Sequence, residues 1–205
     1  MKRRDLLKTG GAAMVLSGGV GQFALAQDAP VIPDMVMGDA NAPVEMIEYA
    51  SFTCPHCARF HADVWPQLKA DYIETGKVRF VYREVYFDRF GLWASMIARC
   101  AGEVRFFAFA DLLYAEQRNW AGSGDPQAVI DSLRTLAKTA GMTDETLDAC
   151  MSDAAKAEAL VGWYQTNAEN DGINSTPSFV INGEKYSNMT YAEMQGILDE
   201  LVGES

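Results

Sequence analysis

Two cysteines separated by two residues stand at the junction of a predicted strand and a predicted helix. Cys54-Pro55-His56-Cys57 follows the apolar run at residues 44–50 and precedes helical spacing of apolar residues up to about residue 75. This spacing brings both sulfurs to the first turn of one helix, close enough to form a disulfide. If Cys54 begins the helix, unpaired backbone N–H groups and the helix dipole favour its thiolate, which is the reactive form. The motif therefore predicts a redox-active pair in an α/β fold.

Residues 1–26 have the pattern of an export signal. Four basic residues at the start precede an uncharged stretch that ends in a small-x-small cleavage site at residues 24–26. The Arg3-Arg4 pair, followed by apolar residues and a lysine, resembles a twin-arginine signal. General-route signals also begin with basic residues, so the export route stays open. The stretch is rich in glycine, whereas a membrane span needs about 20 predominantly apolar residues. We expect removal of this segment and a mature protein in an oxidising compartment, the bacterial periplasm.

The acidic composition restricts the partners of the chain. The whole chain has 17 basic and 28 acidic residues and a net charge of −11. Residues 1–26 hold four basic residues and one acidic residue, so the remainder has 13 and 27, a net charge of −14. Nucleic acids and anionic lipids bind basic surfaces, and we expect neither as a partner. The mature length of about 179 residues suits one domain with or without a large insertion.

Strand patterns lie towards the two ends of the mature chain and enclose a helical block. Residues 78–85 alternate and are rich in β-branched and aromatic types, and residues 178–181 form a further strand followed by an Asn-Gly hairpin turn. A helix over about 191–202 ends the chain. Between residues 88 and 170 the sequence predicts only helices, over about 91–101, 103–117, 125–140, 143–156 and 157–170. This order predicts an α/β sheet interrupted by a helical insertion.

Three motifs resemble those of the DsbA-like thiol oxidases, a branch of the thioredoxin fold. Residues 52–57 contain the Pro-His dipeptide that is most associated with these oxidases between the two cysteines. Residues 172–183 match the loop that carries a cis-proline beside the cysteines. Residues 90–99, with Phe106 and Phe107 after them, resemble the start of the helical insertion. The resemblance extends over about residues 35–203.

This resemblance implies a fold, an activity and partners. We expect a thioredoxin fold with thioredoxin-like parts at residues 27–87 and 161–205. A helical domain at residues 88–160 is inserted between the strand after the first helix and the cis-proline loop. The implied activity is that of a thiol:disulfide oxidoreductase that donates its disulfide to reduced or unfolded exported proteins without a cofactor. A quinone-linked membrane protein is the implied reoxidant, and we expect a monomer.

The resemblance also gives roles to the residues of the motif. Cys54 is the expected exposed nucleophile and Cys57 its shielded partner. A helix N-terminus stabilises a negative charge by only about 0.3–2 kcal/mol, so further donors are expected. The N–H groups of His56 and Cys57 and the His56 ring, next to Pro55, are the candidates. The alternative is that His56 is an ordinary exposed turn residue.

Three residues outside the motif are expected to support it. Glu48 lies where this family has a buried acid near the shielded cysteine, which implies a proton relay to Cys57; the alternative is a solvated strand residue. The Thr176-Pro177 bond is expected to be cis, with the backbone at Thr176 free to pair with a substrate strand. Thr176 is more typical of the isomerase relatives, whereas many oxidases have valine there. The oxidising strength of the pair therefore stays open.

Cys100 and Cys150 form a second pair in the helical block. An even number of cysteines in an oxidising compartment favours a structural disulfide between them, with two buried free thiols as the alternative. A loop of about 50 residues would stabilise the fold by roughly 4 kcal/mol in the chain-entropy model.

Other functional classes fit the sequence less well. Cys54, Cys57 and His61 would give a metal only three ligands, so no metal site is expected and His61 is predicted to be exposed on the helix. A periplasmic disulfide reductase or isomerase is the enzymatic alternative. The isomerase relatives depend on an N-terminal dimerisation domain, for which we expect no room before the first strand. A non-catalytic holdase that grips unfolded chains is the alternative of another class, and the intact Cys-Pro-His-Cys motif argues against it.

Overall fold

A mixed β-sheet forms the centre of this computed structural model, which describes residues 30–203. The predicted export signal at residues 1–26 lies outside the described residues. The strands are β1 (Met35–Met37), β2 (Val44–Ala50), β3 (Val78–Glu84), β4 (Ser178–Ile181) and β5 (Glu184–Ser187), in the order β1-β3-β2-β4-β5. β2 and β3 are parallel, and the other neighbouring pairs are antiparallel. The parallel pair requires a crossover connection, which the first helices supply.

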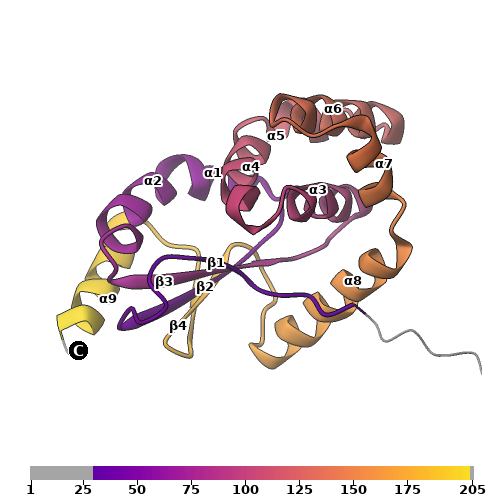
Figure 1. The fold of residues 1–205 in the computed structure, drawn as a ribbon. Helices are drawn as coiled ribbons and strands as arrows, with labels where there is room; N and C mark the ends of the chain where they lie inside the picture. Colours follow the sequence, from indigo (N-terminus) through magenta and orange to yellow (C-terminus); the bar gives the residue numbers. More distant parts are fainter. Residues whose placement is uncertain (1–29, 204–205) are drawn as a thin grey trace, which may run out of the picture.

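Most of the other described residues are helical. α1 (Pro55–Asp63), α2 (Trp65–Leu68) and the π-helical turn η1 (Lys69–Ile73) connect β2 to β3, and α9 (Tyr191–Gly203) follows β5. Between β3 and β4 lie α3 (Arg89–Cys100), α4 (Glu103–Ala115), α5 (Gln117–Ala121), α6 (Pro126–Thr139), α7 (Asp144–Met151) and α8 (Ala154–Asn170). Helices α3 to α7 gather together on one side of the sheet, and α8 lies on the other (Figure 1). Between residues 30 and 203, no helix is both long and apolar enough to cross a membrane.

The predicted α/β fold with a helical insertion is confirmed, and the differences lie at element boundaries. The single helix expected after the cysteine motif is divided at Val64, two residues before Pro66, which has no N–H for the helical ladder. The expected division between residues 156 and 157 is wrong. α8 already begins at Ala154, because the Asp153 side chain accepts a hydrogen bond from the Lys156 N–H at 2.9 Å and caps the helix.

The expected domain boundary between residues 160 and 161 falls inside α8, which is continuous from Ala154 to Asn170. The division into residues 27–87, 88–160 and 161–205 therefore remains a prediction.

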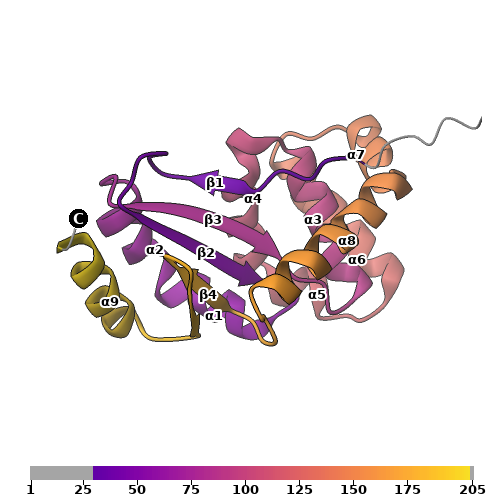
Figure 2. The same cartoon turned by 90° about the horizontal axis from the view of Figure 1, so that it is seen from below.

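The two faces of the sheet are covered by different helices. Side chains alternate along each strand, so Met46 and Phe80 face the main core, which includes residues of α1, α4 and α9. Ile47 and Val81 face the opposite side, where Tyr164 of α8 packs against them. The view from below shows α8 crossing that side (Figure 2). By the same alternation, Glu48 points into the main core, on the face that α1 covers.

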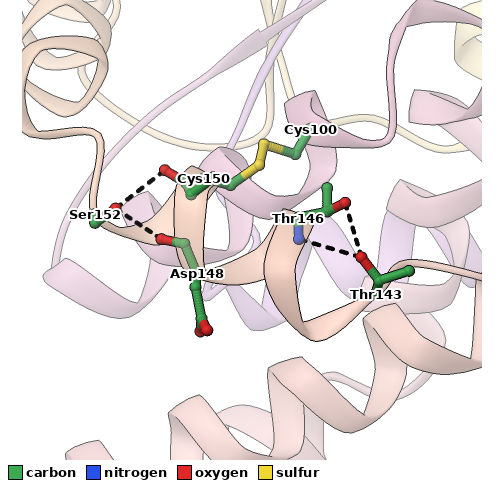
Figure 3. The surroundings of a disulfide bond; sticks show 7 residues. Cys100, Thr143, Thr146, Asp148, Cys150 and Ser152 are labelled. Atoms are coloured by element: carbon green, nitrogen blue, oxygen red, sulfur yellow. Dashed lines mark hydrogen bonds between the residues drawn. A yellow bond between two sulfur atoms is a disulfide. The ribbon is translucent and has the colours of Figure 1, made fainter.

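A disulfide joins two helices of the insertion. Cys100 at the end of α3 is bonded to Cys150 of α7, with 6.3 Å between their Cα atoms (Figure 3). The Thr143 side chain caps the start of α7 by accepting a hydrogen bond from the Thr146 N–H at 3.2 Å. The bond closes a loop across 50 residues of sequence and holds α7 against α3.

Candidate active site

The cysteine motif occupies the start of α1. Cys54 is the N-cap residue with extended backbone angles (φ −80°, ψ 119°), and Pro55 takes the first helical position, where its missing N–H is not needed. Cys57 follows in the first turn and is fully buried, whereas Cys54 is 7% exposed. Both are free thiols. The sequence therefore predicts the placement of both sulfurs correctly, although Cys54 is less exposed than expected.

The surroundings of the two sulfurs shift their pKa values in opposite directions. A hydrogen bond with the Cys57 thiol is the largest cause that lowers the pKa of Cys54, to about 5, against the opposing effect of burial. The Thr176 side chain and the backbone N–H groups of Cys57 and His56 lower this pKa further. Burial raises the pKa of Cys57 well above that of an ordinary thiol, and the hydrogen bond with Cys54 and the charge of Glu48 add to the shift. Cys54 is thus a thiolate at neutral pH and Cys57 a thiol.

The loop before β4 lies against Cys54. The Thr176-Pro177 peptide bond is cis, as the sequence predicts. Cys54 Sγ lies 3.5 Å from the Thr176 carbonyl oxygen, to which Cys54 donates a hydrogen bond only in its protonated form. Residues separated by more than 120 positions in the sequence therefore meet at one sulfur.

The two residues between the cysteines lie at the surface. Pro55 and His56 are both exposed. The backbone N–H of His56 contributes to the lowered pKa of Cys54, as expected. An influence of the His56 ring on the thiolate remains a prediction.

Glu48 is completely buried on the face of the sheet that α1 covers, so the alternative of a solvated strand residue is wrong. Its Oε2 lies 3.2 Å from Nε2 of His61. Burial of a carboxylate requires a partner, and here that partner comes from α1.

The expectation that His61 is exposed is also wrong, because its ring is buried and only 8% of the residue is exposed. His61 lies four residues after Cys57, which places both on the same, inward face of α1. Its ring stacks on Tyr114 of α4 with 4.0 Å between the ring centroids. Among the described residues, no group of three or more His, Cys, Asp or Glu side chains is arranged to hold a metal ion.

Two polar residues that the sequence did not single out hold the segment before Cys54. The buried side-chain amide of Gln117 donates to the carbonyl oxygens of Phe52 and Cys54 at 2.8 and 2.9 Å. Asp88 caps α3 and also accepts a hydrogen bond from the Thr53 hydroxyl at 2.8 Å. Asp88 has a recognisable capping position before a helix, whereas nothing in the local sequence marks Gln117.

Comparison with known proteins places the chain in a family. Residues 31–200 match the family model described as Thioredoxin. The structure superposes on the crystal structure of Wolbachia pipientis alpha-DsbA1 with a TM-score of 0.77 and 27% identity, covering 85% of this chain and 94% of the other. The chain is a DsbA-like member of the thioredoxin family.

Sequence relatives agree with this placement of the DsbA-like chain. It is 32% identical over 173 residues to a putative protein-disulfide oxidoreductase of Rickettsia bellii, and the matched region covers 84% of this chain and 66% of the relative. It is 26% identical over 196 residues to disulfide bond formation protein D of Bacillus subtilis, covering 89% of this chain and 84% of the relative. The chain thus spans just under two thirds of the length of the rickettsial relative.

Proposed function

We propose that this DsbA-like protein is a protein disulfide oxidoreductase that donates the Cys54–Cys57 disulfide to reduced exported proteins. The observation that carries the proposal is the asymmetry of the two sulfurs. Cys54 has a pKa of about 5, and Cys57 is buried with a raised pKa. Stabilising the Cys54 thiolate favours the reduced form of the pair, and an enzyme whose reduced form is favoured is an oxidant.

The reaction consists of two thiol–disulfide exchanges. A substrate thiolate attacks Cys54 Sγ, the Cys54–Cys57 bond breaks, and Cys57 takes up a proton. A second substrate thiolate then attacks the substrate sulfur of the mixed disulfide and releases Cys54 as a thiolate. The substrate loses two electrons and two protons; the enzyme gains both electrons and one proton, and the other proton goes to solvent. The backbone of Thr176, beside the cis-Pro177 bond, is the proposed pairing site for the substrate strand.

The proposed substrates are reduced or unfolded exported polypeptides in a bacterial periplasm. Phe87 is 60% exposed and precedes Asp88, which accepts a hydrogen bond from the hydroxyl of Thr53, the residue before Cys54. An exposed aromatic side chain of this kind suits apolar segments of unfolded chains. A quinone-linked membrane protein as reoxidant and a monomeric state follow from the family resemblance and are part of the proposal.

The test is the reduction potential of the Cys54–Cys57 pair in glutathione buffers, together with the oxidative refolding of a reduced secretory protein. We expect a potential well above that of thioredoxin, about −270 mV, and towards that of DsbA, about −120 mV. A potential at the thioredoxin value would refute the oxidase direction and favour the periplasmic reductase or isomerase. The Cys54→Ser variant separates the enzyme from a holdase, because a holdase keeps its activity without the sulfur.

A further inference from the structure

A line of polar groups leads from the interior beneath Cys57 to the surface. Glu48 and His61 are in contact through Oε2 and Nε2 at 3.2 Å, and Nδ1 of His61 lies 3.9 Å from Oδ1 of Asp111 on α4. Within residues 30–203, the second oxygen of Glu48 and Nδ1 of His61 are buried without a hydrogen-bond partner. A buried polar atom without a partner is costly. The burial of these two unpartnered atoms lowers the stability of the fold, so stability does not account for their presence.

The chemistry of the buried cysteine requires a proton to move. Cys57 has to gain a proton when the pair is reduced and lose one when the disulfide forms again. The residue has no exposed surface, and its raised pKa makes proton loss unfavourable at neutral pH. The charge of Glu48 acts on Cys57, but Glu48 has no exposed surface either. A proton that reaches Glu48 still needs a path to water.

The line of polar groups ends in a groove between α1 and α4–α5. The groove has a volume of about 810 Å³, and its walls include Pro55, His61, Trp65, Asp111, Tyr114 and Gln117. The His61 side chain is only 4% exposed, whereas that of Asp111 is 41% exposed. Water in the groove therefore reaches Asp111 directly, whereas His61 is almost completely shielded from it.

We propose that the proton of Cys57 is exchanged with solvent through Glu48, His61 and Asp111, and that the groove is the exit of this path. The buried acid near the shielded cysteine is already implied by the family resemblance; the new assignment is that His61 and Asp111 carry the proton onward. The inference rests on the proposed redox function of the Cys54–Cys57 pair. His61 and Asp111 are positioning residues that act on Cys57 through Glu48.

An imidazole suits this task because either nitrogen can carry the proton. The carboxylates of Glu48 and Asp111 raise the pKa of His61, while burial opposes them. The titratable and charged groups that face the ring or the groove beside it are Glu48, Asp111, Tyr82, Tyr114, Arg59, Lys69 and Arg118.

An aromatic disulfide that releases a coloured thiolate tests the path. The reduced protein reacts in two steps: Cys54 attacks the reagent and releases one aromatic thiolate, and Cys57 then loses its proton, attacks Cys54 and releases the second. The first phase reports Cys54 alone, and the second phase reports the proton loss of Cys57. A Cys57→Ser variant, which lacks the second phase, assigns it.

We expect His61→Gln, which keeps a hydrogen-bonding side chain of similar length, to leave the first phase unchanged and to slow the second at least about tenfold at pH 7. The second phase should also become steeper with pH, because hydroxide must then remove the proton directly. Asp111→Asn should also slow the second phase, because an amide cannot take up the proton that His61 Nδ1 releases. Asp63→Asn on α1, an exposed acid that faces no part of the path, is the matched control and should behave as the wild type.

A second phase with wild-type rate and pH slope in both His61→Gln and Asp111→Asn overturns the proposal. Equal slowing of both phases in His61→Gln also overturns it, because the histidine would then only hold the shape of the site. The aromatic disulfide oxidises the pair whatever its potential. Failure of the proton path is therefore distinguishable from failure of the oxidase function, which the potential tests separately.

Discussion

The lowered pKa of Cys54 makes the stability of the reduced protein depend on pH. The folded state holds this pKa at about 5, whereas the thiol of an unfolded chain titrates near 8.5. Since folding lowers the pKa, the stabilisation is complete above about pH 8.5 and is lost as the pH falls through about 5. Between these limits the contribution changes by about 1.4 kcal/mol per pH unit, which gives roughly 2.7 kcal/mol at pH 7 and about 0.4 kcal/mol at pH 5.

The Cys54→Ser variant isolates this contribution. Serine does not titrate in this range, so the difference in unfolding free energy between the reduced wild type and the variant should rise by about 2.3 kcal/mol from pH 5 to pH 7. All other titrating groups are common to both proteins and largely cancel, as does any constant packing difference. Urea denaturation in a phosphine reductant, followed by circular dichroism at several pH values, measures the difference.

A flat difference between pH 5 and pH 8 would refute the reasoning. It would mean that the folded protein does not stabilise the Cys54 thiolate, and that the hydrogen bonds from Cys57, Thr176 and the helix N-terminus have no net effect on it. The oxidised wild type is an internal check, because a disulfide does not titrate. The difference in unfolding free energy between the oxidised wild type and the Cys54→Ser variant should therefore not contain the rise that comes from Cys54.

Three further changes test the framework around the site. Gln117→Ala removes the side-chain donor from the carbonyl oxygens of Phe52 and Cys54, of which the second still accepts from the Ala58 N–H, and should destabilise the protein by about 1–3 kcal/mol in urea denaturation. Arg99→Met leaves Glu84, its buried bidentate partner at 2.6 Å, without a counter-charge and should destabilise by about 3–5 kcal/mol in the same assay, part of which the additional change Glu84→Met should recover. The paired change of Cys100 and Cys150 to Ala should lower stability by about 4 kcal/mol while the alkylation rate of Cys54 stays at the wild-type value.

Local patterns in the sequence predict much of this fold. The strand at Val44–Ala50 is predicted with its observed bounds, because five of its seven residues are apolar and the segment holds no Gly or Pro. β1 is missed, since Met35–Met37 is three residues long and is a strand only because it pairs with β3. Short elements of this kind depend on their neighbours in space, which periodicity within one segment does not show.

The residues of the candidate site also fall into those that the local sequence reveals and those that depend on neighbours in space. Cys54 and Cys57 are found through a spacing that is local in the sequence, and Pro177 through the chemistry of its loop. His61 is misjudged because a histidine on a helix looks solvent-exposed until Glu48 supplies a buried partner from another element. Gln117 is missed because its function is to bond two carbonyl oxygens more than 60 residues away. Buried polar partners are properties of the packed structure, so a single segment does not reveal them.

The same pKa gives one contribution to the reduction potential. A thiol with a pKa near 7, as in thioredoxin, gains only about 0.4 kcal/mol from ionisation at pH 7, whereas a pKa of about 5 for Cys54 gives roughly 2.7 kcal/mol. The difference of about 2.3 kcal/mol corresponds to about 50 mV for a two-electron couple, which raises the potential from about −270 mV to about −220 mV. The interval from there to about −120 mV requires interactions beyond the ionisation of Cys54.

We expect the exposed ring of His56 to account for part of this difference in potential. We therefore expect a wild-type potential above about −220 mV, which falls towards this value in His56→Ala. The wild-type potential should change by about 30 mV per pH unit between pH 6 and pH 8, because only one proton accompanies the two electrons. Glutathione equilibration at several pH values measures both quantities. A slope near 60 mV per pH unit would show that both thiols are protonated on reduction, and Cys54 would then have no stabilised thiolate from which an oxidising potential could arise.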